Sequence, residues 1–353
     1  MEKRIVIMAG GTGGHVFPAL AVAKALQQQG WAVSWMGTHK GLESRIVPEQ
    51  GIEMDWLSVQ GVRGKGTGTK IRAVFKLLKA CAEARAVLKQ RHPDVVLGMG
   101  GFVAAPGGLM SRMLGIPLLI HEQNRVPGTT NRLLKRFACK VMEAFPGSFE
   151  ASVGALFTGN PLRQDMLRLQ GKAPRRLHEQ DRFRILVFGG SQGAEVLNQK
   201  VPEALAGFEN ISVKHQTGAA MLTQVQQHYA KQNTPAEVMA FIDDMAAAYE
   251  WADMVICRSG AMTVSEVAAA GLPAIFVPLP HAIDDHQTAN ARYLCDNNAG
   301  VLMPQSEMTI ERMRQAIKQI RADLLTMSQA ARKKARFDAT DAVVAQCIEE
   351  AGR

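Results

Sequence analysis

The hydrophobic pattern of the first thirty residues predicts a strand, a tight turn and a helix. Residues 5–7 are all apolar, too few for a helix, and a glycine-rich turn follows at residues 10–14. After Pro18, which a first helical turn tolerates, apolar residues recur with helical spacing as far as Leu26. This order predicts the opening unit of a parallel α/β sheet.

The order of strand, turn and helix recurs along the chain. Residues 159–184 have weak periodicity and are interpreted as a linker, after which residues 184–198 (RILVFGGSQGAEVLN) echo residues 4–18 (RIVIMAGGTGGHVFP). Closing helices are expected from residue 309 to about residue 350. Further strands are predicted at residues 31–36, 94–101 (ending in a second glycine turn), 116–120, 238–241, 254–257 and 274–277. The pattern therefore predicts two α/β domains.

Length and composition agree with two globular domains. The chain has 353 residues, of which 47% are hydrophobic, so each domain has enough apolar material for a core. The longest apolar stretch, residues 99–120, is interrupted by prolines and an arginine, and only a few apolar residues precede the first glycines. We therefore expect a cytoplasmic protein that is not integral to a membrane. The net charge of +9 predicts an anionic partner, which is phosphate, nucleic acid or an acidic membrane surface.

Cysteine and histidine patterns predict no metal centre. The five cysteines lie far apart and form no C-x-x-C pair, so they are expected to be reduced core thiols. The nearest approach to a ligand cluster is His281, Asp284, Asp285 and His286. Loop carboxylates beside a histidine are usually solvated, so we expect no metal there.

The first glycine turn does not fit a dinucleotide site. Counted from Gly11, the G-x-G-x-x-G pattern requires glycine where Val16 stands, and the second strand runs into Gly37 without the acidic residue that binds ribose. The carboxyl ends of parallel strands share one edge of a sheet, where open α/β folds bind ligands. Three turns should meet at that edge, at residues 10–15, 98–101 and 121–124.

A helix predicted at residues 70–91 combines apolar and basic side chains. Its apolar residues are spaced to share one face, and basic residues interleave with them. The set comprises Ile71, Val74, Phe75 and Leu78 with Lys70, Arg72, Lys76 and Lys79. Two interpretations are open: a surface helix that packs its apolar face on the sheet, or a segment that rests on an anionic membrane. Burial of Phe75 favours the first, and its exposure favours the second.

A second candidate site lies in residues 258–273 (RSGAMTVSEVAAAGLP). Ser259 or Gly260 begins a turn, and a helix is predicted at residues 263–270 with Gly271 at its end. This order places backbone N–H groups and Glu266 around a ligand at a helix N-terminus. Alternatively, Glu266 is an ordinary acid that the helix dipole favours near this end.

Seven motifs, in their order along the chain, resemble the MurG family of bacterial UDP-N-acetylglucosamine transferases. They are GGTGGH at 10–15, GMGG at 98–101, HEQN at 121–124, GNPLR at 159–163, GGSQGA at 189–194, FIDDM at 241–245 and RSGAMTVSEVAAAGLP at 258–273. The resemblance implies the GT-B fold, in which two Rossmann-like domains face a cleft and the last helix crosses back to the first domain. It also implies an acceptor and membrane-association domain at 1–160 plus 337–353, and a donor domain at 161–336.

The resemblance implies a defined reaction. The family moves N-acetylglucosamine (GlcNAc) from UDP-GlcNAc to the C4 hydroxyl of undecaprenyl-pyrophosphoryl-N-acetylmuramyl-pentapeptide (lipid I), which gives lipid II for peptidoglycan synthesis. It implies an inverting hexosyltransferase that forms a β-1,4 link on the cytoplasmic face of the inner membrane. Besides UDP-GlcNAc and lipid I, the implied partners are the anionic membrane surface and other cell-wall synthesis proteins. No cofactor is implied, and the lack of a D-x-D motif predicts a metal-independent reaction.

The resemblance also assigns site residues. The donor-binding set is Arg163, Ser191, Gln192, Gly193, Ile242, Met262, Thr263, Glu266, His286 and Gln287. The acceptor-binding set is Thr12, Gly13, Gly14, Gly100, Gly101 and Asn124. His15 is the candidate general base, because an imidazole exchanges protons near neutral pH, and Glu122 is a reserve base. The family often has glutamine where His286 stands and tyrosine where Phe102 stands, so a phenolic role is not expected at Phe102.

Alternatives to this interpretation stay open on the sequence. His15 has a structural alternative, in which it caps the turn or binds the acceptor pyrophosphate. Another GT-B enzyme, such as a lipid-directed sugar transferase or a UDP-sugar epimerase, is one alternative function. A non-enzymatic nucleotide- or nucleic-acid-binding module is another, although aromatic residues are only 6% of the chain and do not interleave with basic ones. Nucleic acid is therefore not an expected partner, and we interpret GGTGGH as the cradle of the lipid pyrophosphate.

Overall fold

The computed structural model describes residues 2–59, 67–178, 180–190, 193–280 and 283–352. The chain divides into two compact units, Met1–Arg163 with Phe337–Arg353, and Gln164–Arg336. Each unit is a parallel sheet with helices packed on it, so the prediction of two parallel-sheet α/β domains is confirmed.

The first unit contains a seven-stranded sheet in the order β3-β2-β1-β4-β5-β6-β7, and all its strand pairs are parallel. β1 lies between β2 and β4, so the strand order reverses there and opens a crevice at the carboxyl ends of β1 and β4. The strands are β1 (Arg4–Met8), β2 (Ala32–Gly37), β3 (Glu53–Trp56), β4 (Val95–Gly98), β5 (Leu118–Glu122), β6 (Lys140–Glu143) and β7 (Leu156–Phe157).

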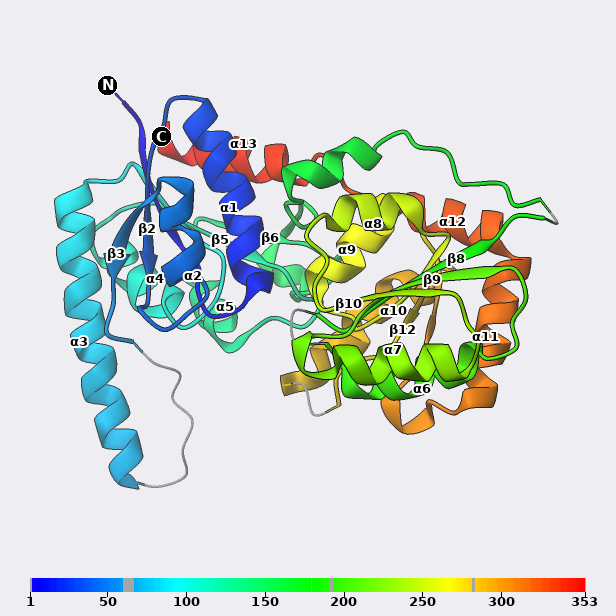
Figure 1. Ribbon diagram of the computed structural model, residues 1–353. Coiled ribbons are helices and arrows are strands. Elements are labelled where there is room, and N and C mark those ends of the chain that lie inside the picture. Colours follow the sequence, from blue (N-terminus) through cyan, green and yellow to red (C-terminus); the bar gives the residue numbers. More distant parts are fainter. Residues whose placement is uncertain (1, 60–66, 179, 191–192, 281–282, 353) are drawn as a thin grey trace. The chain divides into compact units, whose positions relative to one another are not determined.

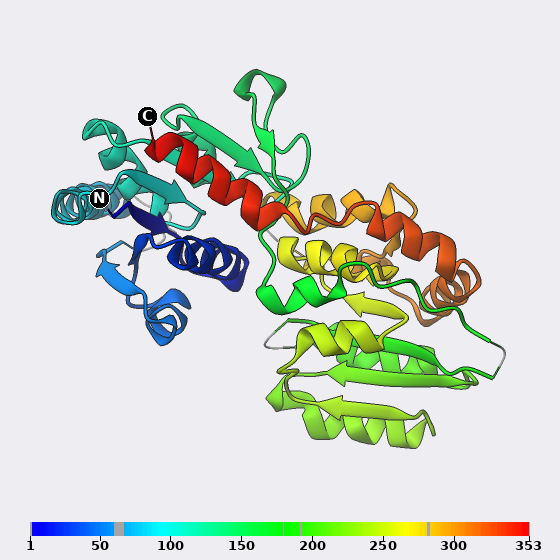
Figure 2. The ribbon, with the colours of Figure 1, turned by 90° about the horizontal axis from the view of Figure 1, so that it is seen from above.

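Successive residues of β1 point to opposite faces of this sheet, and each face has its own core. Ile5 and Ile7 pack with α1 and α13, whereas Val6 and Met8 pack with the helices of the other face. Figure 2 shows α13, at the end of the chain, lying over the first unit together with α1. The helices are α1 (Gly13–Gln28), α2 (Glu43–Ile46), α3 (Thr67–Arg91), α4 (Ala104–Met113), α5 (Thr129–Leu134) and α13 (Ala339–Ala351), with the 3₁₀ turns η1 (Pro48–Gln50) and η2 (Ala151–Val153).

The second unit contains a six-stranded parallel sheet in the order β10-β9-β8-β11-β12-β13. Here the strand order reverses between β8 and β11, which are the strands that precede the GGSQGA turn and the RSGAMT turn. The strands are β8 (Phe183–Phe188), β9 (Ile211–Gln216), β10 (Ala236–Met239), β11 (Met254–Cys257), β12 (Ala274–Phe276) and β13 (Gly300–Leu302).

Helices cover both faces of the second sheet, with α6 and α7 on one face and α8 and α9 on the other (Figure 1). The helices are α6 (Glu195–Leu205), α7 (Leu222–Lys231), α8 (Met245–Trp251), α9 (Ala261–Ala270), α10 (His286–Cys295), α11 (Ile310–Ala322) and α12 (Leu324–Arg332). The 3₁₀ turns are η3 (Gln164–Leu169), η4 (Ala219–Met221), η5 (Ile283–Asp285) and η6 (Gln305–Glu307).

Several predicted boundaries differ from the structure, and one of them affects the site. The strand expected at residues 116–120 continues through Glu122, because His121 and Glu122 pair with β6. The first two residues of the HEQN motif therefore belong to a buried strand and not to the loop after it. The strand expected at 238–241 is β10, which ends at Met239.

Candidate functional site

The two glycine turns of the first unit contact each other at the point where its strand order reverses. Gly101 has a φ of +84°, and a Cβ there would lie 2.4 Å from the carbonyl oxygen of Gly10. Gly100 has a φ of +95°, and a Cβ there would lie 2.7 Å from Nδ1 of His15. Only glycine allows this approach, so these two predicted acceptor residues bring the turn after β4 against the first turn and the His15 ring.

Glu43, which the sequence analysis missed, holds the first glycine turn from behind. Its carboxylate is fully buried and accepts hydrogen bonds from the Gly11 N–H (2.9 Å), the Thr38 N–H (3.0 Å) and the Thr38 hydroxyl (2.8 Å). A Cβ at Gly10 or Gly41 would collide with this carboxylate, at 2.6 Å and 1.9 Å. The signal available in the sequence was glycine: Gly10 and Gly41 have no side chain and so leave the space that the Glu43 carboxylate fills.

The start of α1 brings backbone donors to the end of the first glycine turn. Thr12 precedes the helix, and its carbonyl accepts the N–H groups of His15 and Val16. Gly13 and Gly14 are the first two helical residues, so their N–H groups lie in the first turn, where a helix binds anions. A cavity of about 220 Å³ in this unit is lined by Gly10 and Gly11 of the first glycine turn and by Phe102 and Val103, which follow the second. Its other lining residues include Thr38, Lys40 and Glu43.

His15 is half-buried in the first turn of α1, and its Nδ1 lies 2.8 Å from Oε1 of Gln123. Gln123 is buried at the end of β5 and contacts His121 through its other amide atom. Sequence reasoning gave Gln123 no role, because a single glutamine within a motif has no distinctive spacing.

Glu122 organises its own loop. It is buried, and its Oε1 accepts hydrogen bonds from the backbone N–H (2.9 Å) and the side-chain amide (3.3 Å) of Asn124. Its Oε2 accepts from the Gly128 N–H (3.0 Å) and the Asn131 amide (2.8 Å). A carboxylate has about four lone-pair positions, so a proton taken up by Glu122 would displace one of these bonds.

In the second unit, Gly193 of the GGSQGA motif packs against the residue that follows β9. Gly193 has a φ of +76°, and a Cβ there would lie 2.0 Å from the carbonyl oxygen of Thr217. That carbonyl is held by the amide of Asn198, which in turn contacts the buried His215. Ser191 and Gln192, which were predicted to bind the donor, lie outside the described residues.

Gln216 connects two predicted donor-binding segments, although no motif indicated it. Its buried amide donates to the Gly190 carbonyl (2.8 Å) and accepts the Ile242 N–H (3.3 Å). The side chain therefore fixes the turn after β8 relative to the turn after β10. A nucleotide base that accepts a hydrogen bond from the Ile242 N–H would displace the Gln216 side-chain oxygen from it.

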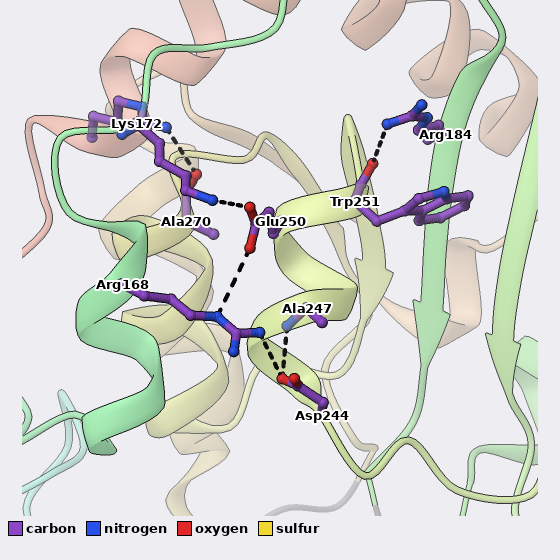
Figure 3. A network of polar contacts seen from close by, with 9 residues as sticks. Arg168, Lys172, Arg184, Asp244, Ala247, Glu250, Trp251 and Ala270 are labelled. Atoms are coloured by element: carbon purple, nitrogen blue, oxygen red, sulfur yellow. Dashed lines mark hydrogen bonds and ion pairs between the residues drawn. The ribbon is translucent and has the colours of Figure 1, made fainter.

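Asp244 fixes the segment that contains Ile242. It caps α8 by accepting the Ala247 N–H at 2.8 Å, and it also accepts a hydrogen bond from Arg168 of η3 (Figure 3). The Ala247 N–H, followed by Arg168, holds the pKa of Asp244 below its usual range. Arg168 also pairs with Glu250 at the other end of this short helix, so η3 holds α8 at both ends.

Helix α9 carries three of the predicted donor residues at its N-terminal end. Met262 and Thr263 are in the first turn and Glu266 is in the second, and all three are half-buried. Oε2 of Glu266 accepts a hydrogen bond from the Tyr249 hydroxyl at 3.1 Å. The helix begins two residues earlier than predicted, at Ala261, and ends at Gly271 as expected.

The other donor-side predictions fall in three places. His286 and Gln287 begin α10 and are half-buried, and Gln287 accepts the Leu279 N–H at 2.9 Å. Arg163 belongs to the first unit, as the last residue before the chain enters the second. The resemblance implied that it lies in the donor domain. Arg258, a residue that was not predicted, donates to the carbonyls that follow β12 and to Gln305. Its burial lowers its pKa.

Helix α3 is buried along one half and exposed along the other. Ala80, Ala84 and Leu88 are buried, whereas Phe75 is 68% and Leu78 60% exposed. Lys76 and Lys79 are also exposed, on the half of the helix that extends beyond the sheet (Figure 1). The side chains of Lys70, Ile71, Arg72 and Val74 lie outside what the structure describes.

The described part of the chain contains neither a candidate membrane span nor a candidate metal cluster. No helix there is both long and apolar enough to cross a membrane. No three histidine, cysteine or carboxylate side chains gather there as a metal site would require. His281, from the predicted cluster, lies outside the described residues.

Comparison with known proteins gives consistent matches along the whole chain. Residues 5–143 match the glycosyltransferase family 28 N-terminal domain, and residues 184–346 match its C-terminal domain. A protein of Methylococcus capsulatus named UDP-N-acetylglucosamine–N-acetylmuramyl-(pentapeptide) pyrophosphoryl-undecaprenol N-acetylglucosamine transferase is 57% identical, with all of both chains covered. A protein of the same name from Tolumonas auensis is 48% identical over 98% of this chain and 99% of its own.

Solved structures agree with these matches. The crystal structure of Acinetobacter baumannii MurG has a TM-score of 0.85 and 44% identity, and the match covers 98% of this chain and 99% of that one. A UDP-GlcNAc 2-epimerase from Neisseria meningitidis has a TM-score of 0.68 at 10% identity, with 98% of this chain and all of that one covered, which shows a shared fold alone. This chain therefore belongs to the MurG family of N-acetylglucosamine transferases, within glycosyltransferase family 28.

Proposed function

We propose that this enzyme transfers GlcNAc from UDP-GlcNAc to the C4 hydroxyl of the MurNAc sugar of lipid I, inverts the anomeric carbon and so forms lipid II. The observation that carries the proposal is the 57% identity, over the full length of both chains, to a transferase whose name states these substrates. The two carboxyl-edge sites, one in each unit, supply the two substrate sites that such a transfer requires.

We place UDP-GlcNAc in the second unit. The first turn of α9 offers N–H groups to the diphosphate, and Gly193 packs closely on the Thr217 carbonyl. The Glu266 carboxylate has the acceptors that a ribose diol needs, and Tyr249 holds one of its oxygens in place. Arg163 adds positive charge for the departing UDP, so the reaction needs no metal ion.

We place the lipid I head group in the first unit, against the two glycine turns. The Gly13 and Gly14 N–H groups at the start of α1 would bind the pyrophosphate, while the Gly11 N–H is already bonded to Glu43. His15 is the proposed general base for the acceptor hydroxyl. We assign Glu122 to the loop that carries Asn124, because its four hydrogen bonds stabilise that loop.

We propose that the exposed half of α3 rests on the anionic inner-membrane surface. Phe75 and Leu78 present apolar area to solvent, and Lys76 and Lys79 lie beside them. Such a helix inserts its apolar side chains at the lipid boundary while its lysines attract anionic head groups. This position would keep the first unit next to a substrate that is anchored in the bilayer.

The test measures UDP release and sugar transfer with and without a lipid I analogue. We expect both to require the acceptor and to continue after rigorous chelation of divalent cations. Release of UDP without acceptor, together with an epimerised sugar, would favour the epimerase alternative. Within the proposed reaction, His15→Ala should lower kcat by about 100-fold or more and change the KM for UDP-GlcNAc little. A wild-type kcat would remove His15 from the mechanism.

A further inference from the structure

The side chains of His15, Gln123 and His121, next to the first glycine turn, are joined by a continuous series of hydrogen bonds. Nδ1 of His15 lies 2.8 Å from Oε1 of Gln123, and Nε2 of Gln123 lies 3.0 Å from Nδ1 of His121. We infer that Gln123 and His121 are positioning residues that keep the proton of His15 on Nδ1 and leave the lone pair on Nε2. The use of that lone pair in catalysis rests on the proposed function.

The direction of every bond in the chain follows from two backbone carbonyls. Nε2 of His121 lies 2.9 Å from the Gly159 carbonyl, which can only accept, so this nitrogen carries a proton. A neutral His121 then has its lone pair on Nδ1 and accepts from the Gln123 amide nitrogen. That same nitrogen donates its second proton to the His121 carbonyl at 3.2 Å. The amide oxygen of Gln123 therefore faces His15, which must donate from Nδ1.

The opposite orientation of the Gln123 amide is disfavoured at two contacts. Its oxygen would then face the His121 carbonyl oxygen at 3.2 Å, with no proton between the two acceptors. It would also require a second proton on His121, which is completely buried. Burial lowers the pKa of His121 to about 4, so the ring is neutral at physiological pH.

The three hydrogen-bonded side chains are held in place by the residues around them. His121 is on β5, and its carbonyl also accepts the Asn131 amide. The carbonyl of Gln123 accepts the Asn160 amide at 3.1 Å, and the Gln123 side chain is 1% exposed. The His15 ring lies against Gly100, where any side chain would displace it. A fixed ring with a fixed tautomer is what a general base needs, as in catalytic triads where a carboxylate orients histidine.

The deciding measurement is the tautomer of each histidine in the full-length enzyme. In ¹⁵N-histidine-labelled protein at pH 8, two-bond ¹H–¹⁵N NMR should show His15 protonated on Nδ1 and His121 protonated on Nε2. Each histidine signal is assigned by its disappearance from the spectrum of the His15→Gln or the His121→Gln variant. A wild-type His15 protonated on Nε2 would overturn the inference. This readout does not depend on turnover, so absent transferase activity would refute the proposed function alone.

A second measurement connects the tautomer to the rate. Gln123→Leu removes both contacts, so we expect mixed His15 tautomers and a kcat that is lower by about 10- to 100-fold, with the KM for UDP-GlcNAc changed less than about twofold. Gln123→Glu keeps an oxygen acceptor toward Nδ1 of His15 but turns its second oxygen toward the His121 carbonyl, so it should keep the Nδ1 tautomer of His15 without recovering the full rate. Ser111→Ala is the matched control. It removes the hydrogen bond from the buried Ser111 to the Ile116 carbonyl (2.9 Å) in the same unit and leaves His15, Gln123 and His121 unchanged. A wild-type kcat in Gln123→Leu, or an equal loss in Ser111→Ala, would contradict the inference.

Discussion

Glu43→Gln tests whether a buried carboxylate holds the first glycine turn. In the wild type, one oxygen accepts two bonds from Thr38 and the other accepts the Gly11 N–H. The best orientation of a glutamine keeps its side-chain oxygen toward Thr38 and turns its NH₂ group toward Gly11. The NH₂ group and the Gly11 N–H, which are both donors, then face each other. At least one charge-assisted bond is lost, which should lower the free energy of unfolding of the first unit by about 1.5–3 kcal/mol.

The assay follows each unit separately, because a chain of two units need not unfold in one step. Urea unfolding, monitored by hydrogen exchange, should show earlier opening in the first unit and faster exchange of the Gly11 and Thr38 amides. The second unit should keep its wild-type midpoint. Glu49→Gln is the matched control, since it makes the same change at an exposed glutamate six residues away. Unchanged protection of the Gly11 amide in Glu43→Gln would refute the reasoning.

Three further predictions test other parts of the molecule. Gly193→Ala should weaken UDP binding by about tenfold or more in calorimetry, because its Cβ would lie 2.0 Å from a carbonyl, whereas Gly207→Ala, with a similar φ and open space, should not. Burial lowers the pKa of His215 to about 3, below its unfolded value of about 6.5, so its neutral form contributes stability above pH 6.5 that is lost as the pH falls. Wild type should lose about 1.6 kcal/mol between pH 6.5 and pH 5 in urea unfolding from this residue, and His215→Gln should lose less. Phe75→Ser should reduce binding to anionic vesicles without changing UDP binding, while the exposed Leu156→Ser should change neither.

The sequence predicted those parts of the fold that depend on neighbours along the chain. The strand at residues 254–257 is β11 with the same bounds, and the helix after it ends at Gly271, whose φ of +66° is the left-handed cap that glycine favours. Both signals are local: an apolar run of strand length, and a glycine after the last apolar position. The two-domain prediction came from the same kind of evidence, a repeated strand, turn and helix.

The contacts that shape the candidate sites were beyond such reasoning. Glu43 bonds Gly11 from 32 residues away, and His15 meets Gln123 from 108 residues away. These pairs exist because β1 lies between β2 and β4, with β5 beside β4, and hydrophobic periodicity does not encode strand order. For the same reason the HEQN motif was placed in a loop, although pairing with β6 makes His121 part of the strand.

The two halves of the chain share one strand, turn and helix scaffold, and one of the positions at which they differ is that of His15. The echo of residues 4–18 in residues 184–198 aligns His15 with Glu195. Glu195 is exposed and accepts a hydrogen bond from Gln199 of its own helix, whereas His15 contacts the buried Gln123, which in turn contacts His121. Gly10 and Gly13 of the first turn align with Gly190 and Gly193 of the second, and a Cβ at Gly193 would lie 2.0 Å from the Thr217 carbonyl oxygen. Of this aligned pair, only the first turn carries an imidazole bonded to buried polar side chains, which is why we place the proposed general base there and the nucleotide in the second unit.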